Sequence, residues 1–184
     1  MNLSKYFDPR ENSLLIGYKE KFEFFVNLIL QKKLPQVILL SGEKGIGKTT
    51  FVCHLMHYLF DPKNYDIKSN CILKKGSFSN LFLQNLHSNI FFLTGSDFKN
   101  IGIDDIRKLK NNLQKSTFSG NRFIIFENID LFNSNSLNGL LKIIEEPNPN
   151  NYFILIYNKS KILLETVKSR CLEIKLQLKE KYRQ

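Results

Sequence analysis

The segment that most constrains this chain is Gly42-Glu43-Lys44-Gly45-Ile46-Gly47-Lys48-Thr49, which fits the pattern GxxxxGK[ST] in full. An apolar run over residues 37–40, typical of a buried strand, comes directly before it. A helix predicted over residues 48–60 follows, and Asp61-Pro62 ends that helix. Strand, glycine-rich loop and helix in this order are the setting of a phosphate-binding loop, and they disfavour the alternative of an ordinary glycine-rich turn.

The residue types of this loop suit the binding of a nucleoside triphosphate. Glycines let the backbone curl so that successive N–H groups face a phosphate, and the following helix adds its positive N-terminal end. Lys48 is expected to reach the β- and γ-phosphates, and the Thr49 hydroxyl to ligate Mg²⁺. ATP and Mg²⁺ are therefore the predicted cofactors. The predicted nucleotide-binding residues of the loop are Gly42, Glu43, Lys44, Gly45, Ile46, Gly47, Lys48, Thr49 and Thr50.

A phosphate-binding loop needs a second strand that ends in an acid. The apolar run over residues 123–126 leads into Glu127, which we predict to support Mg²⁺ through water. The alternative is a surface acid that closes a strand. The next residue is Asn128, and an amide cannot act as a general base that orients water. Weak or absent ATP hydrolysis by this chain alone is therefore expected.

The rest of the chain alternates between helical periodicity and short apolar runs. Helices are expected over residues 19–33, from Asp104 onward, and over 133–146 and 162–169. Further strands are expected at 90–93, 153–157 and 172–178. Residues 61–89 carry little pattern, with a short strand within 71–76 and a short helix over 78–86. This rhythm predicts an α/β domain with a largely parallel sheet covered on both faces.

The composition leaves several classes of protein open and excludes others. The formal net charge of +10 suits a surface that meets nucleic acid, but a chain without alanine and rich in Lys, Asn, Ile and Phe equally reflects an AT-rich genome. Both interpretations stand. The three cysteines have no CxxC spacing, so no zinc is expected, and Cys53 is predicted to be a small apolar residue of a helix. No apolar run approaches the roughly 20 residues of a membrane span, and no signal peptide begins the chain, which favours the cytoplasm.

Four further segments resemble, in order, the landmarks of clamp-loader AAA+ subunits of bacterial DNA polymerase III. The segment 34–42, LPQVILLSG, is similar to the lead-in of their phosphate-binding loop, with Gln36 in place of a usual His. Ile106-Arg107-Lys108-Leu109 followed by Gly120 resembles a second landmark. The segment 138–147, NGLLKIIEEP, resembles "NALLK-x-LEEP", and 166–171, TVKSRC, matches "T-[IV]-x-SRC". Together the landmarks cover about residues 17 to 175.

The resemblance implies a RecA-like AAA+ P-loop NTPase core with a mainly parallel five-stranded sheet and helices on both faces. It implies that residues 1–175 form this core and that 176–184 begin a lid domain that is truncated or absent. In the family, the Arg of SRC is an arginine finger that reaches the γ-phosphate on a neighbouring subunit, which would be Arg170 here. Asn158 falls near the position where a polar side chain contacts the γ-phosphate. The implied partners are the gamma/tau and delta subunits, the sliding clamp and primed DNA, within a DNA polymerase holoenzyme and with no membrane.

The departures from the family pattern favour one type of subunit. The delta-prime type is favoured by the degenerate acid pair at Glu127 and Asn128, by the missing zinc cysteines and by the sequence of residues 150–171. The intact loop favours gamma/tau. The family's lid and collar would follow Gln184. The sequence thus predicts a delta-prime-like subunit that binds ATP and acts in trans. A gamma/tau-type ATPase, a non-hydrolysing AAA+ scaffold and, with less support, a free-standing P-loop kinase are the alternatives.

Overall fold

The structure, a computed structural model, describes residues 8–74, 76–94, 109–110, 113 and 120–182. The chain forms two compact units. The sheet unit comprises residues 35–44 and 88–176, and the helical unit comprises 1–34, 45–87 and 177–184. The boundary between them falls inside the glycine-rich loop, after Lys44.

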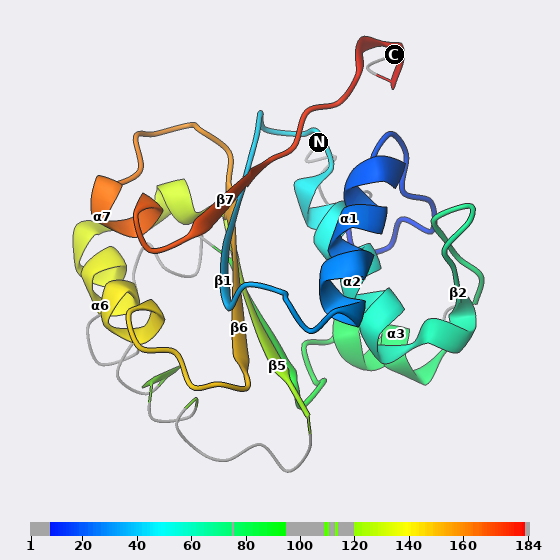
Figure 1. Cartoon of the computed structure of the whole chain (residues 1–184), viewed down its shortest axis with the longest axis horizontal. Helices are drawn as coiled ribbons and strands as arrows, with labels where there is room; N and C mark the ends of the chain where they lie inside the picture. Colours follow the sequence, from blue (N-terminus) through cyan, green and yellow to red (C-terminus); the bar gives the residue numbers. More distant parts are fainter. Residues whose placement is uncertain (1–7, 75, 95–108, 111–112, 114–119, 183–184) are drawn as a thin grey trace, which may run out of the picture. The chain divides into compact units, whose positions relative to one another are not determined.

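The sheet unit is built on five parallel strands (Figure 1). The strands run in the spatial order β4-β5-β6-β1-β7, so that β1 is inserted between two strands that come late in the chain. All neighbouring pairs are parallel, and their carboxyl ends therefore meet at one edge of the sheet. This confirms the predicted five-stranded parallel sheet. The strands are β1 (Val37–Ser41), β4 (Ile90–Thr94), β5 (Arg122–Glu127), β6 (Asn151–Tyr157) and β7 (Leu172–Lys175).

The core of the sheet unit lies between the sheet and helix α6 (Ser134–Ile144). Every residue of β1 is buried, as expected of a central parallel strand whose two faces are both apolar. Helix α6 begins where the Asn133 side chain accepts a 2.8 Å hydrogen bond from the Ser136 backbone N–H, an N-cap. Helix α7 (Glu165–Lys168) lies beside α6, on the same side of the sheet (Figure 1). The α6 residues in the core are Leu137, Leu140, Ile143 and Ile144.

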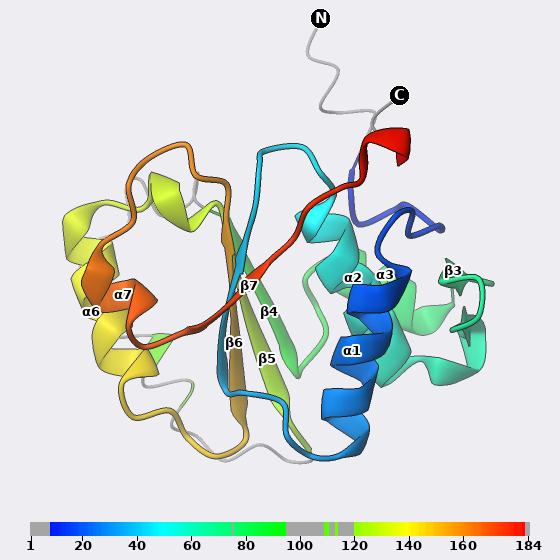
Figure 2. The same ribbon diagram turned by 45° about the horizontal axis from the view of Figure 1, so that its top comes forward.

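The helical unit holds its three helices together with aromatic side chains. Phe22 and Phe25 of α1 meet Phe51 of α2 edge to face, at ring-centroid distances of 5.8 and 5.2 Å. Figure 2 shows α1 and α2 side by side. Cys53 is buried within α2, as predicted. The elements of this unit are α1 (Lys19–Leu30), α2 (Lys48–Phe60), α3 (Ser77–Leu83), the short antiparallel pair β2 (Tyr65–Asp66) and β3 (Cys71–Ile72), and single 3-10 turns at Pro62–Asn64 and Glu180–Tyr182.

Several predicted elements are longer than those observed. Helix α1 ends at Leu30, short of residue 33, because Lys32 adopts a left-handed conformation (φ 56°) and the Lys33 N–H returns to Leu28 O. Helix α7 is shorter than the expected 162–169, and Ile162 is 94% exposed. Strand β7 ends at Lys175 instead of residue 178. Of the helix expected from Asp104, only residues 109, 110 and 113 are described, and they are helical; residues 104–108, and with them most of the Ile106-Arg107-Lys108-Leu109 landmark, lie outside the described residues.

Candidate functional site

The glycine-rich loop begins at the carboxyl end of β1, in the sheet unit. Ser41, the last residue of that strand, donates a 2.5 Å hydrogen bond from its hydroxyl to Glu173 Oε1 of β7. The Gly42 N–H donates to Tyr157 O, at the carboxyl end of β6. The start of the loop is thus tied to both neighbours of β1, whereas Glu43 and Lys44 after it are exposed.

The second half of the loop, from Gly45, belongs to the helical unit and leads into α2. Gly45 and Gly47 have φ angles of +85° and +87°, which residues with a Cβ rarely adopt. Helix α2 starts at Lys48, and the Phe51 N–H already donates to Gly47 O. Lys48 and Thr50 are buried. The loop therefore has the two glycine-dependent turns that a phosphate-binding backbone needs, and a 13-residue helix starts where it ends.

A pocket of about 210 Å³ lies in the helical unit against this half of the loop. Tyr18 forms part of its wall, and the Tyr18 hydroxyl donates a 2.6 Å hydrogen bond to Ile46 O. Gly17 lies next to it with φ +81°, and a Cβ there would come within 2.6 Å of Leu178 Cδ1. Sequence reasoning did not find this pocket, because its walls come from three separate segments. The lining residues are Asn12, Leu14, Leu15, Ile16, Tyr18, Gly45, Ile46, Gly47, Thr50, Leu178 and Tyr182.

In the sheet unit, the loops after β5 and β6 meet at the carboxyl edge. Glu127 ends β5, is half-buried, and pairs in register with Thr94 of β4. Asn158 Nδ2 donates a hydrogen bond to Asn128 Oδ1, and Asn128 is held in a left-handed conformation (φ 55°). The structure therefore brings the predicted Asn158 to the position that follows Glu127. Lys48 and Thr49 belong to the helical unit.

Asp130 has a structural partner at the same edge. Its side chain is buried, and its Oδ2 accepts a 2.9 Å hydrogen bond from the Ser160 backbone N–H. Its Oδ1 is buried without a hydrogen bond from the residues that the structure describes. This carboxylate joins the loops after β5 and β6 and leaves Glu127 as the acid at the strand end.

Arg170 lies just after α7 and is exposed. Its Nη2 donates to Glu145 Oε1 at 2.9 Å, and its Nη1 donates to Thr166 O at 3.0 Å. Glu145 is the residue at the C-terminus of α6. The predicted finger residue thus has a carboxylate partner within its own chain, which the sequence pattern did not indicate.

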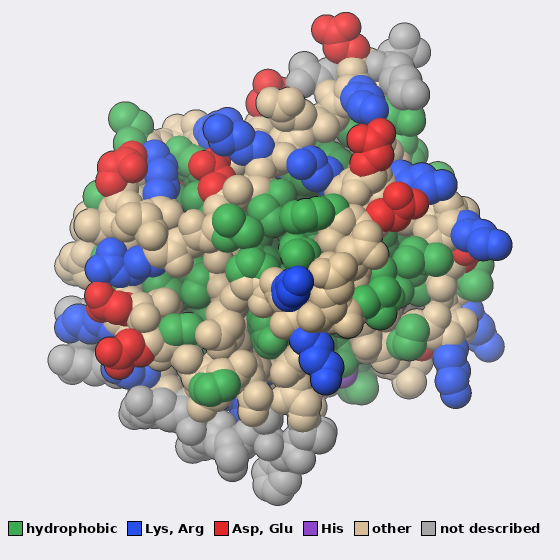
Figure 3. Space-filling view, in the orientation of Figure 1, with side chains coloured by type: hydrophobic (Ala, Val, Ile, Leu, Met, Phe, Trp, Pro, Cys, Tyr) green, Lys and Arg blue, Asp and Glu red, His purple; other side chains and the backbone are tan. Residues whose placement is uncertain are grey.

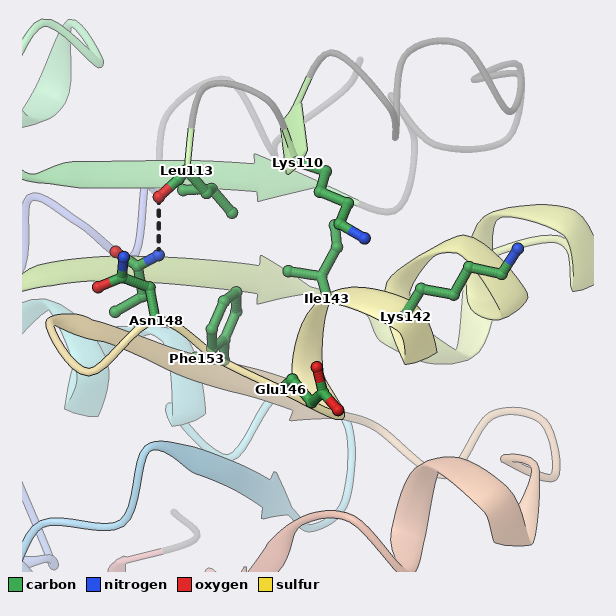
Figure 4. Close-up of a pocket in the computed structure, with 8 residues that line it drawn as sticks. Lys110, Leu113, Lys142, Ile143, Glu146, Asn148 and Phe153 are labelled. Atoms are coloured by element: carbon green, nitrogen blue, oxygen red, sulfur yellow. Dashed lines mark hydrogen bonds between the residues drawn. The ribbon is translucent and has the colours of Figure 1, made fainter. Parts of the chain in front are cut away.

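A second pocket, which belongs to the sheet unit, lies at the opposite ends of the strands. Its volume is about 250 Å³, and it is lined by Phe153 and Asn151 at the start of β6 and by Lys142 and Glu146 near the end of α6 (Figure 4). Asn151 Nδ2 donates to Leu113 O across it. Because Glu127 lies at the carboxyl end of β5 and Asn158 directly after β6, this pocket is separate from the predicted site.

The surface charge of the face shown in Figure 3 is mixed, and the described residues of the chain form neither a metal-ligand cluster nor a helix that could span a membrane. Over α6 and α7, acidic side chains lie among the basic ones, so this face is not uniformly basic (Figure 3). Across the described ranges, no three His, Cys, Asp or Glu side chains gather as metal ligands would. Nor is any helix of those ranges both long and apolar enough to cross a membrane.

Comparisons with known proteins agree with the predicted family. Residues 17–180 match the family model described as "DNA polymerase III, delta subunit". A DNA polymerase III subunit delta' of Buchnera aphidicola is 32% identical over 161 residues, which is 85% of this chain and 47% of that protein. A DNA polymerase III subunit gamma/tau of Mycoplasma genitalium is 28% identical over 159 residues, or 85% of this chain and 26% of that one. The chain spans about half the length of the delta' relative it matches.

Solved structures share the fold. A DNA polymerase III gamma subunit-related protein from Thermotoga maritima superposes with a TM-score of 0.59 at 22% identity, over 88% of this chain and 47% of that one. The Thermotoga maritima RuvB Holliday junction branch migration motor superposes with a TM-score of 0.54 at 18% identity, over 92% of this chain and 49% of that one. These likenesses confirm the predicted RecA-like AAA+ core.

Proposed function

The chain belongs to the DNA polymerase III delta-subunit family, and on that premise we propose that it is an ATP-binding clamp-loader subunit of the delta-prime type. In this proposal it helps a sister subunit to place the sliding clamp on primed DNA. The observation that carries the proposal is the complete phosphate-binding motif between β1 and α2, in which Gly45 and Gly47 both adopt positive φ angles.

The residues of the motif fit ATP and Mg²⁺. We assign the phosphates to the loop amides of residues 42–47 and to Lys48, and Mg²⁺ to Thr49 and, through water, to Glu127. The pocket beside Gly45–Gly47, with its apolar lining, fits the base of the nucleotide. Lys48 and the loop amides would orient the phosphates, and Mg²⁺, when bound, would supply positive charge that offsets theirs.

Hydrolysis by this chain alone is expected to be slow. The position after Glu127 is an amide, Asn128, which is hydrogen-bonded to the amide of Asn158. Neither amide takes up a proton at neutral pH, so neither can serve as a general base for an attacking water. Asp130 already accepts a hydrogen bond from the Ser160 backbone. The arrangement supports holding ATP with little turnover.

Arg170 is assigned to act in trans, on nucleotide held by a neighbouring subunit. Its guanidinium is permanently charged and exposed, as a donor to phosphate on another chain must be. The proposed partners are the gamma/tau and delta subunits, the sliding clamp and primed DNA, in the cytoplasm. Residues 1–175 would supply the AAA+ core, and 176–184 the start of a lid domain.

A gamma/tau-type ATPase is the second candidate, because the phosphate-binding motif is intact and some relatives carry that name. It predicts brisk hydrolysis by the chain alone. A non-hydrolysing scaffold, the third candidate, predicts no ATP binding.

The test is ATP hydrolysis by the chain alone, by a gamma/tau-type subunit alone, and by the two mixed. We expect little turnover by the chain, and a partner rate that rises only while Arg170 is present. An Arg170→Ala variant should lose the increase in the partner's rate. An Arg10→Ala variant, which removes an arginine far from Arg170 in the sequence, should keep it. Brisk turnover by the chain alone would overturn the delta-prime assignment in favour of the gamma/tau type.

A further inference from the structure

In the part of the chain that the structure describes, the guanidinium of Arg170 has three acceptors, which lie in or directly after helices α6 and α7. Nη2 donates to Glu145 Oε1 at 2.9 Å. Nη1 donates to Thr166 O at 3.0 Å and approaches Ser169 Oγ at 3.5 Å. Thr166 and Ser169 are neighbours of Arg170 along the chain, whereas Glu145 is 25 positions away, at the end of α6. Among the described residues, Glu145 is therefore the acceptor that fixes the arginine relative to another element.

The contacts leave part of the guanidinium available. An arginine side chain carries five N–H donors, on Nε, Nη1 and Nη2. The observed bonds use Nη1 and one hydrogen of Nη2. Within the described part of the chain, Nε–H and the second Nη2 hydrogen have no acceptor. Two donors thus remain for an acceptor outside the chain, and a phosphate presents oxygens that accept two parallel N–H bonds.

The position of Glu145 is well defined by its surroundings. It follows the last residue of α6, whose buried face packs into the core of the sheet unit, and its own N–H donates to Leu141 O. Pro147 stands two residues later and prevents the helix from continuing. A carboxylate anchored in this way can hold a long, flexible side chain in one direction.

The ion pair between Arg170 and Glu145 contributes little to the stability of the fold. Both side chains are partly solvated, at 35% exposed for Arg170 and 56% for Glu145. Exposed ion pairs of this kind contribute little to the free energy of unfolding. Their larger effect is on orientation, because a planar guanidinium that is already held loses less freedom when it binds a phosphate.

We propose that Glu145 is a positioning residue for Arg170, which holds the guanidinium at the exposed end of α7 with two N–H donors directed to a phosphate on a second chain. This inference rests on the proposed trans role of Arg170 and names the residue that prepares it. Glu145 does not touch the nucleotide itself.

The first test needs no second chain. Rotation of the Arg170 guanidinium about its Nε–Cζ bond is measured by NMR in protein labelled with ¹⁵N-arginine. We expect slow rotation in the wild-type chain and faster rotation in Glu145→Ala, with an intermediate rate in Glu145→Gln, which keeps an acceptor but loses the charge. Glu146→Ala is the matched control, since Glu146 is the adjacent exposed acid and forms no hydrogen bond or ion pair with Arg170. Equal rotation in Glu145→Ala and wild type would overturn the proposal.

The second test uses the mixture with a gamma/tau-type subunit. Glu145→Ala should lower the maximal partner rate about tenfold, less than Arg170→Ala does, with the partner's KM for ATP unchanged. Adding Glu145→Ala to Arg170→Ala should have no further effect, because a residue that acts through Arg170 has nothing left to position. Additive losses would instead indicate a separate structural role and overturn the proposal.

The outcomes separate this inference from the proposed function. If Arg170→Ala leaves the partner rate unchanged, both the trans finger and its positioning are overturned. If Arg170→Ala abolishes the increase while Glu145→Ala matches the wild type, the finger stands and the positioning role alone is overturned. Equal unfolding temperatures of Glu145→Ala and Glu146→Ala would show that both variants are folded when the rates are measured.

Discussion

The Tyr18 hydroxyl donates a 2.6 Å hydrogen bond to the backbone oxygen of Ile46, in the middle of the glycine-rich loop. The Tyr18 ring is buried and meets Phe51 of α2 edge to face. One side chain therefore joins the segment before α1 to the loop and to the helix that follows the loop. All three belong to the helical unit, and this contact fixes the second half of the loop within it.

Tyr18→Phe removes this hydrogen bond and keeps the ring. We expect the free energy of unfolding to fall by about 1 kcal/mol, because Ile46 O loses its donor. ATP affinity should fall several-fold as the loop loses its support. Urea denaturation and calorimetry measure the two effects. Tyr152→Phe is the control, since no hydrogen bond of that hydroxyl appears among the described residues, and equal ATP affinities of Tyr18→Phe and wild type would contradict the role given to Tyr18.

Gly45→Ala and Gly47→Ala test the two turns of the loop. A Cβ at Gly45 has no atom within 4 Å, and at Gly47 it is 3.8 Å from Tyr18, so neither substitution causes a clash. The cost comes from φ angles near +85°, and we expect each change to destabilise the chain by about 1 kcal/mol.

The matched control for the glycine pair is Gly76→Ser, because Gly76 is the N-cap of α3, a position that serine fills at least as well as glycine. Gly76 has a φ of −103°, and a Cβ there meets its neighbours at ordinary distances of 3.8 Å and beyond. This variant should unfold at nearly the same urea concentration as the wild type. Similar destabilisation at all three positions would show that backbone conformation is not the cause.

The sequence is informative where apolar pattern and turn chemistry agree. Continuous apolar runs predict the strands β1, β4, β5 and β6 to within one or two residues, because a parallel strand is buried on both faces. The loop and α2 follow from the glycine spacing and from Asp61-Pro62. The fold and the glycine-rich loop between β1 and α2 could therefore be predicted from local patterns.

What the sequence does not reveal depends on tertiary contact. Lys32 ends α1 in a left-handed conformation that only the return bond from Lys33 to Leu28 explains, and lysine gives no such signal. The apolar Ile162 suggests a helix face, yet it lies exposed outside α7. The pairs Tyr18–Ile46 and Arg170–Glu145 join residues 28 and 25 positions apart, and no local rule connects them.

His54 makes stability depend on pH. It is fully buried in α2, with Nδ1 3.1 Å from the Tyr65 hydroxyl and Nε2 3.0 Å from Asn12 O. The pKa of His54 is lowered from 6.5 to about 4, mainly by burial; the Asn12 hydrogen bond raises it and the nearby His57 lowers it. The unfolded chain therefore binds one more proton between pH 6.5 and 4, and the free energy of unfolding decreases as pH falls through that window.

The effect is largest by pH 4 and amounts to roughly 3 kcal/mol for a shift of this size. Urea denaturation at pH 7 and at pH 4.5 measures it, with His54→Gln as the comparison. Carboxylates contribute equally to both proteins, so the loss on acidification should be smaller in His54→Gln. Identical losses in the two proteins would contradict a neutral, buried His54.

Binding of ATP·Mg²⁺ to the whole chain, measured by calorimetry for the wild type and Lys48→Ala, tests the central claim most directly. The account predicts one site per chain, with affinity at least about tenfold weaker in Lys48→Ala, because a charge-assisted contact to phosphate is lost. An unchanged circular dichroism spectrum shows that the variant is folded. Absence of binding by the wild type, or equal binding by Lys48→Ala, would contradict nucleotide binding at this loop and leave the scaffold as the better account.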